Sequence, residues 1–150
     1  MMAKGFTLVE LLIVFAILGI VAVFSIPFIQ SFQVSSDLYT QADTLTKTLR
    51  RARQQAIIGQ NQAAWGVYFD NGNKEFILYQ GTDFISRDSS FDTVFEYPPT
   101  FELSTDFGQE VNFRVFSGDA SVSGTVILTS TNNQSSRINI NDSGLIEIND

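Results

Sequence analysis

The sequence predicts an α+β fold in which a long amino-terminal helix packs on an antiparallel β-sandwich head. Three observations support this prediction. The first part of the chain is almost continuously apolar, as in a helix that is hydrophobic on all sides. The next part has apolar residues at helical spacing. From residue 62 onward, apolar residues alternate with polar ones, as they do in half-buried strands.

Four parts follow from this division of the 150 residues. They are a leader (1–5), an apolar helix (6–29), an amphipathic helical half (30–58) and a β-rich globular head (59–150). The chain has room for one domain beyond the apolar helix.

The apolar helix is long enough to cross a membrane core, which needs about 20 residues. Residues 11–26 carry no charge, and their one hydroxyl group belongs to Ser25. One acid, Glu10, stands near the start of the segment. A charge inside a membrane segment costs about 2.5–3.5 kcal/mol on insertion scales, so we expect Glu10 to have a specific role.

The leader does not fit an ordinary secretory signal, whose cleavage site follows its apolar core. Here the small residue, Gly5, comes before the apolar segment and just after Lys4. A cut between Gly5 and Phe6 therefore leaves the hydrophobic helix on the mature protein. A generic single-pass anchor is the alternative, and it explains the hydrophobicity but not this pattern.

The run G-F-T-L-V-E-L-L at residues 5–12 resembles the class III signal of type IV pilins and of the pseudopilins of type II secretion. The resemblance implies that a membrane-embedded prepilin peptidase cuts after Gly5 on the cytoplasmic side and methylates the new terminus at Phe6. It implies that Glu10 meets the amino terminus of an adjacent subunit during filament assembly. Pro27 stands where many pilins carry a proline that interrupts the helix, so we expect a kink there.

Elementary electrostatics supports the role assigned to Glu10. After cleavage, Phe6 would carry an α-amino cation. Opposite charges attract far more strongly in a low dielectric than in water, and an unpaired charge in lipid is costly. A carboxylate on a neighbouring subunit could neutralise this cation and fix the register between subunits.

The amphipathic half has one apolar stripe at steps of four and three residues, which predicts a helix with one buried face. The stripe consists of Leu38, Ala42, Leu45, Leu49, Ala52 and Ala56, and Gly59 is the expected end of the helix. The basic residues Lys47, Arg50, Arg51 and Arg53 lie near that end, where cations favour the helix dipole. We interpret this basic cluster as a solvated helix end, with a contact to a neighbour's acids as the alternative.

The head reads as short strands separated by turns, which predicts an antiparallel sandwich. The expected strands are 64–69, 75–79, 94–97, 101–103, 111–115, 122–128, 137–140 and 145–148. Asn71-Gly72 marks a hairpin between the first two strands. The stretch Gly81–Thr93, with Asp83, Asp88 and Asp92, is predicted to be a mobile surface loop, with calcium binding as the alternative.

Composition excludes several classes of function. The chain has no Cys and no His, so catalytic triads, Cys-His dyads and zinc sites built from imidazole or thiolate are unavailable. We therefore expect no enzyme, no cofactor and no metal site. The formal net charge is −7, and residues 59–150 carry 13 acids against 4 bases, a balance of −9. Such a head repels phosphates, so DNA binding is not expected.

Four stretches, one at the end of the helix and three in the head, resemble the minor pseudopilin H family of general secretion and related minor type IV pilins. They are L-R-R-A-R-Q-Q-A-I at 49–57, V-N-F-R-V-F-S-G with the later G-T-V-I-L (111–118 and 124–128), and R-I-N-I-N-D-S-G-L-I at 137–146. The resemblance implies a β-sandwich head packed on the helix and a low-abundance subunit at or near the filament tip. DNA-binding relatives end in a basic Gly-Arg segment, whereas this chain has Gly144-Leu145-Ile146-Glu147.

The implied location is the inner membrane, crossed once, with the head outside the cytoplasm and the subunit assembled into a filament. The implied partners are other pilin or pseudopilin subunits, the prepilin peptidase, the inner-membrane assembly platform and membrane lipid. A secretion pseudopilus, a type IV pilus and a competence pilus all remain open. The alternative function is a tip module that binds DNA, a secreted substrate or a surface.

We predict that the mature chain begins at Phe6 and is methylated on its amino group, because a small residue directly precedes an apolar helix behind a cationic leader. Mass spectrometry of the mature amino terminus checks this. An intact Met1 in membranes that contain an active prepilin peptidase would contradict it.

Overall fold

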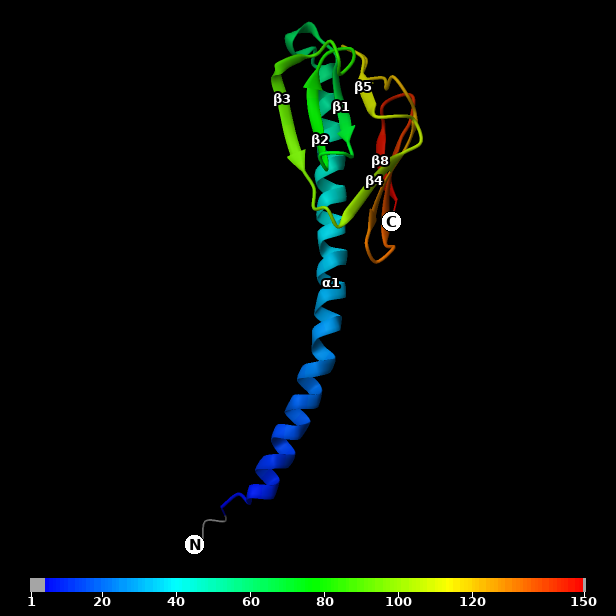
Figure 1. Ribbon diagram of the computed structural model, residues 1–150. Coiled ribbons are helices and arrows are strands. Elements are labelled where there is room, and N and C mark those ends of the chain that lie inside the picture. Colours follow the sequence, from blue (N-terminus) through cyan, green and yellow to red (C-terminus); the bar gives the residue numbers. More distant parts are fainter. Residues whose placement is uncertain (1–4, 150) are drawn as a thin grey trace. The chain divides into compact units, whose positions relative to one another are not determined.

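The computed structural model describes residues 5–149, with the side chains of residues 23–32 excepted. One long helix, α1 (Leu8–Ile57), is followed by a short 3₁₀ turn, η1 (Gln60–Gln62), and eight strands (Figure 1). The chain forms two compact units, Met1–Val34 and Ser35–Asp150. The second unit contains the end of α1 and all the strands, and it is the head described below.

Eight strands form two four-stranded antiparallel sheets. The first sheet has the order β3-β2-β1-β5, and the second has the order β4-β6-β7-β8. The strands are β1 (Trp65–Asp70), β2 (Glu75–Gln80), β3 (Asp88–Glu96), β4 (Phe101–Thr105), β5 (Glu110–Phe113), β6 (Gly124–Ser130), β7 (Ser135–Ile140) and β8 (Ile146–Asn149). This arrangement confirms the predicted α+β class with two antiparallel sheets.

The first hairpin forms where Asn71-Gly72 predicts it. Asp70 pairs with Glu75, and the side chain of Asp70 accepts hydrogen bonds from the backbone N–H groups of Gly72 and Asn73 at 2.9 and 3.1 Å. Because an Asp side chain can bind the backbone two or three residues onward, it closes the four-residue turn locally.

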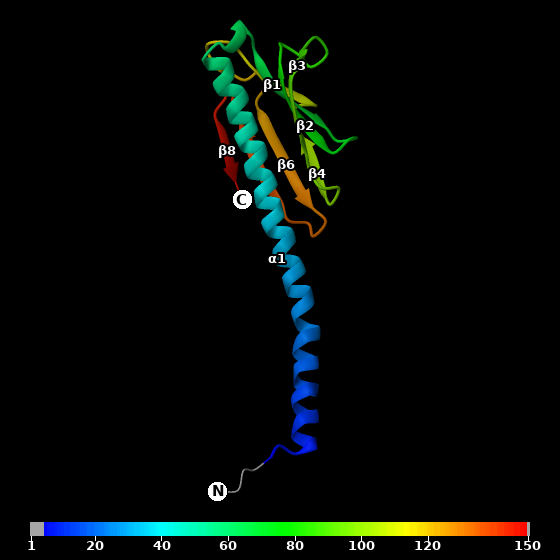
Figure 2. The ribbon, with the colours of Figure 1, turned by 90° about the vertical axis from the view of Figure 1, so that its left-hand side faces the viewer.

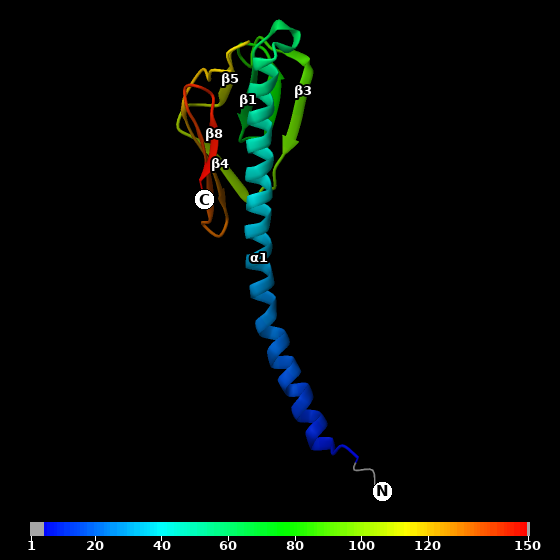
Figure 3. The ribbon, with the colours of Figure 1, turned by 180° about the vertical axis from the view of Figure 1, so that it is seen from behind.

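The end of α1 lies against both sheets and completes one core. All six residues of the predicted stripe are buried, none of them more than 3% exposed. Seen from behind, the second half of α1 crosses in front of the strands, with β3 on one side and β8 on the other (Figure 3). In Figure 2 the same part of the helix runs between β8 on one side and β6 with the first sheet on the other. The apolar cluster includes Trp65, Val67, Phe69, Phe76, Leu78, Val111 and Phe113 of the first sheet, and Phe101, Leu103, Val126, Leu128, Ile138, Ile140 and Ile146 of the second. Neither sheet has a separate core.

The predicted loop at Gly81–Thr93 is wrong in its second half, because β3 already begins at Asp88. The run D-S-S-F-D-T shows no apolar alternation because β3 is an edge strand that pairs only with β2. Its first four residues are exposed. Charged residues on an edge strand also discourage pairing with other chains. The register slips between the pairs of Leu78 and Gln80, so this part of the ladder is irregular.

The strand predicted at 111–115 ends two residues earlier, at Phe113. The chain turns there because Phe116 adopts a left-handed φ of 66° and its N–H donates to the carbonyl of Ala56 at 2.8 Å. A contact with the end of the helix therefore overrides the alternating pattern at Val115.

The helix assignment of α1 runs through position 27. The side chain of Pro27 and the last part of the predicted apolar span, 23–29, lie outside the described residues. The kink at Pro27 therefore stays a prediction. Among the described residues, no helix meets the length and hydropathy expected of a membrane span.

Candidate functional site

The amino end of α1 is closed by Thr7 and Glu10. The Thr7 N–H and hydroxyl donate to Oε2 of Glu10 at 3.1 and 3.0 Å, and the Glu10 N–H donates to the Thr7 hydroxyl at 3.3 Å. This reciprocal arrangement is a capping box, which satisfies backbone donors that have no partner inside the helix. Glu10 therefore holds the first turn of its own helix within a single chain.

Gly5 and Phe6 precede the helix, which begins at Leu8. Both residues are exposed, and the side chain of Phe6 is 83% exposed. The peptide bond between them therefore lies outside regular secondary structure. A protease can bind this bond in an extended form without first unwinding the helix. The cleavage and methylation themselves stay predictions.

The first turns of α1 expose apolar side chains on every face. They are Leu8, Val9, Leu11, Leu12, Ile13, Val14, Phe15, Ile17, Leu18, Ile20 and Val21, and each is at least 48% exposed. A helix that is apolar all round requires lipid or other helices around it. This surface and the acid Glu10 occupy the same segment.

Two residues of the basic cluster form hydrogen bonds with the head. Arg50 donates to the carbonyl of Ile146 at 3.0 Å. Arg53 donates to the carbonyls of Gly118 and Ser143 at 3.4 and 3.2 Å. Arg53 is partly buried, so the interpretation as a solvated helix end is wrong for Arg53, whereas Arg50 is exposed and keeps its contact with solvent. None of the cluster lies in the last turn of α1, so the helix dipole does not explain their position.

The other two members of the basic cluster differ. Lys47 forms an exposed ion pair with Asp43 at 2.6 Å, one helical turn away. Such surface pairs contribute little stability. Arg51 is exposed. The cluster is thus two arginines that hold the strands to α1 and two bases on the helix surface.

Two glycines make room for Arg53. A Cβ on Gly144 would lie 3.0 Å from Nε of Arg53 and 2.1 Å from the Gly118 carbonyl oxygen. A Cβ on Gly118 would lie 2.5 Å from the side chain of Ile57. Both glycines also have left-handed φ angles, 73° and 72°, which side chains disfavour. Three of the four stretches that resemble the pseudopilin family, 49–57, 111–118 and 137–146, therefore meet at Arg53.

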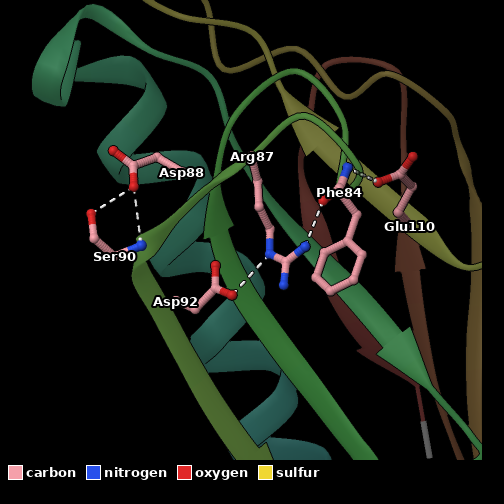
Figure 4. Close-up of polar contacts among 6 residues, drawn as sticks. All are labelled: Phe84, Arg87, Asp88, Ser90, Asp92 and Glu110. Atoms are coloured by element: carbon pink, nitrogen blue, oxygen red, sulfur yellow. Dashed lines mark hydrogen bonds and ion pairs between the residues drawn. The ribbon is translucent and has the colours of Figure 1, made fainter.

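Each of the three acidic residues that follow β2 contacts a different nearby side chain. Asp83 accepts hydrogen bonds from Ser86. Figure 4 shows that Asp88 accepts from Ser90 and that Asp92 pairs with Arg87, at 2.8 Å. In the described part of the chain, no three acidic side chains are grouped to hold a metal ion. The geometry therefore does not favour the calcium alternative.

Sequence reasoning missed two features. The pattern Thr-x-x-Glu at Thr7 and Glu10 is a sequence sign of a capping box and could have been found. The fixing of the loop after β2 by Phe84 and Glu110 had no such sign, because those residues are 26 positions apart and meet only through the sheet.

We predict that Arg53→Ala lowers the free energy of unfolding of a fragment that contains the head, residues 31–150, by about 1–2 kcal/mol, because two carbonyls and an aliphatic stem lose their contacts. Arg51→Ala, an exposed neighbour, is the control and should change it by less than about 0.5 kcal/mol. Urea unfolding followed by circular dichroism measures both. Equal effects of the two substitutions would contradict the role of Arg53.

Comparisons with known proteins agree with this picture. Residues 1–26 match the family model described as the prokaryotic N-terminal methylation motif. The fold is similar to that of the minor pseudopilin EpsH from the type 2 secretion system of Vibrio cholerae, with a TM-score of 0.59 and 12% sequence identity. The alignment covers 75% of this chain and 96% of that one. No curated protein sequence matches the chain. The resemblance inferred from the sequence is thus supported at two levels: the chain begins with a match to this methylation motif, and its fold is similar to that of a minor pseudopilin.

Proposed function

We propose that the protein is a minor pseudopilin or minor type IV pilin, a membrane-anchored subunit of an extracytoplasmic filament. One observation carries this proposal. The amino-terminal methylation motif coincides with a helix that exposes apolar side chains on all faces and has one acid in its first turn. Lipid can cover such a helix before assembly, and other helices can cover it afterwards.

Maturation would change the surroundings of Glu10. Cleavage after Gly5 would leave an α-amino cation on Phe6, next to the residue that caps the helix. Glu10 would then exchange hydrogen bonds within its own chain for a charge pair with the amino terminus of an adjacent subunit. In a low dielectric, this pairing compensates both charges.

The head has a structural role in this proposal. Its fold resembles that of a pseudopilin, and its largest buried side chains form the packing core described above. The proposal also includes a position at or near the filament tip, processing by the prepilin peptidase and contact with the inner-membrane assembly platform. The single membrane crossing, with the head outside the cytoplasm, belongs to it as well.

The charge of Glu10 can be tested apart from its capping role. Glu10→Gln keeps an oxygen that can accept the Thr7 hydrogen bonds, since Gln also completes a capping box, but it removes the charge. We predict that this variant inserts into the membrane as well as the wild type, because a charge has been removed from the apolar segment, yet enters filaments several-fold less.

Quantitative immunoblotting of membranes and of sheared filaments measures insertion and assembly separately. Asp37→Asn is the matched control, because Asp37 is an exposed acid of the same helix outside the apolar segment. If Glu10→Gln enters sheared filaments as fully as Asp37→Asn, the proposed charge pair is not needed for assembly.

A further inference from the structure

A groove at the end of α1 brings two positive charges and apolar side chains together. It lies between α1 and the turn before β8, two elements that are neighbours in Figure 3. Its volume is about 420 Å³, and its lining residues are Arg50, Arg53, Gln54, Ile57, Gly144, Leu145 and Ile146. Ile57 and Leu145 are 39% and 46% exposed, so the apolar walls of the groove are open to a partner.

The two guanidinium groups in this groove bind carbonyl oxygens rather than carboxylates. Arg50 donates to one backbone carbonyl and Arg53 donates to two, which holds both side chains in place but leaves their charges uncompensated. Among the described residues, no Asp or Glu lies within ion-pair distance of either arginine. Acids are nevertheless abundant, since residues 59–150 carry 13 acids against 4 bases. A partner that brings a carboxylate to the groove would compensate these charges.

The contacts with the carbonyls explain how the arginines hold the strands on the helix. They do not require Ile57 and Leu145 to be exposed beside the two charges. Exposed apolar surface with a polar rim is typical of an interaction site. The groove therefore has the composition of a site for a ligand that is both acidic and apolar.

The order of these groups along α1 indicates the spacing that the ligand needs. Arg50, Arg53 and Ile57 follow one another at steps of three and four residues, so they lie on one face of the helix. At a rise of 1.5 Å per residue, Ile57 lies about 8 Å beyond the midpoint of the two arginines. In an extended peptide, side chains two residues apart point to the same side at a distance of about 7 Å. An acidic residue and an aliphatic residue at positions i and i+2 therefore match the groove.

We propose that the α1–β8 groove binds an extended segment of a different filament subunit, in which Asp or Glu stands two residues from an aliphatic side chain. The carboxylate would pair with the guanidinium groups of Arg50 and Arg53, a charge-assisted contact that fixes its orientation. The aliphatic side chain would lie between Ile57 and Leu145. The choice of partner rests on the proposed function, because a low-abundance subunit at or near the tip has other proteins as its neighbours.

A synthetic peptide tests this chemistry on the purified full chain in detergent micelles. The probe is an acetylated and amidated pentapeptide of the order Ala-Asp-Ala-photoleucine-Ala, in which photoleucine forms a covalent bond to its surroundings on irradiation. Mass spectrometry locates the labelled residues, which we expect to be those of the groove. The same peptide with Asn in place of Asp should give several-fold less label there. Equal labelling by the two peptides, or label mainly outside the groove, would overturn the proposal.

Two substitutions on the protein examine the same charge. Arg50→Gln removes the charge of an exposed side chain in the groove, and Arg51→Gln is the matched control, an exposed neighbour that does not line the groove. We expect Arg50→Gln to reduce labelling by the Asp peptide several-fold and Arg51→Gln to leave it unchanged. Equal labelling of the two variants would speak against the proposed carboxylate contact. The comparison of the Asp and Asn peptides needs no protein variant, so it holds whatever Arg50→Gln does to folding.

Photo-cross-linking in cells identifies the partner. Gln54 lines the groove and is exposed, so the full chain with Gln54→p-benzoyl-phenylalanine keeps both arginines and both apolar walls. We expect an adduct with a different filament subunit, linked within a segment of the acidic and aliphatic spacing. An adduct with a second copy of this chain, with a protein outside the filament, or with a segment that lacks this spacing would overturn the proposal.

Incorporation of the chain into sheared filaments is measured in the same cells. Normal incorporation without an adduct would overturn the groove contact and leave the proposed function intact. Absent incorporation of the wild type would contradict the proposed function, and the peptide labelling would then decide by itself whether the groove binds an acidic segment.

Discussion

The apolar stripe of α1 is the constraint on which the head depends. Two four-stranded sheets share one core, and the helix contributes residues to it along five turns, from Leu38 to Ala56. Each large apolar side chain buried in this way contributes about 1.5–3 kcal/mol. The alanines of the stripe are fully buried as well. Without the helix, both sheets would expose an apolar face.

This dependence explains why the conspicuous head motifs concern packing rather than chemistry. Arg53 extends from α1 between two turns of the head, and Gly118 and Gly144 leave the space that it occupies. These three residues lie far apart in the sequence, at positions 53, 118 and 144. In the structure, the three segments hold the ends of the strands on the helix.

Much of the fold could be predicted because helical and strand periodicities are local. The stripe at steps of four and three residues and the hairpin at Asn71-Gly72 both lie where the pattern places them. The beginning of β3 could not be predicted, because an edge strand with polar residues has no burial pattern. The alternating pattern predicted that Val115 belongs to a strand, because the pattern does not include the contact that ends this strand. That contact joins Phe116 to Ala56 at the end of α1, and the two residues are 60 positions apart.

The candidate site was predictable in a different way. The sequence around Gly5, Phe6 and Glu10 pointed to processing and assembly, and the motif match at residues 1–26 supports the class of protein. The structure adds that Thr7 and Glu10 cap the helix in a single chain. Contacts between subunits cannot be inferred from periodicity, because periodicity indicates only which residues are buried within their own chain.

Native-state hydrogen exchange on the head, residues 31–150, tests most directly whether α1 and the two sheets share one cooperative core. The shared core predicts that amides of α1 between Leu45 and Ala52 exchange only by global unfolding, with the same free energy as the central strands β1 and β6. Exchange of these helix amides at a much lower free energy, while β1 and β6 stay protected, would show that the sheets are stable without the helix and would contradict the central role of the stripe.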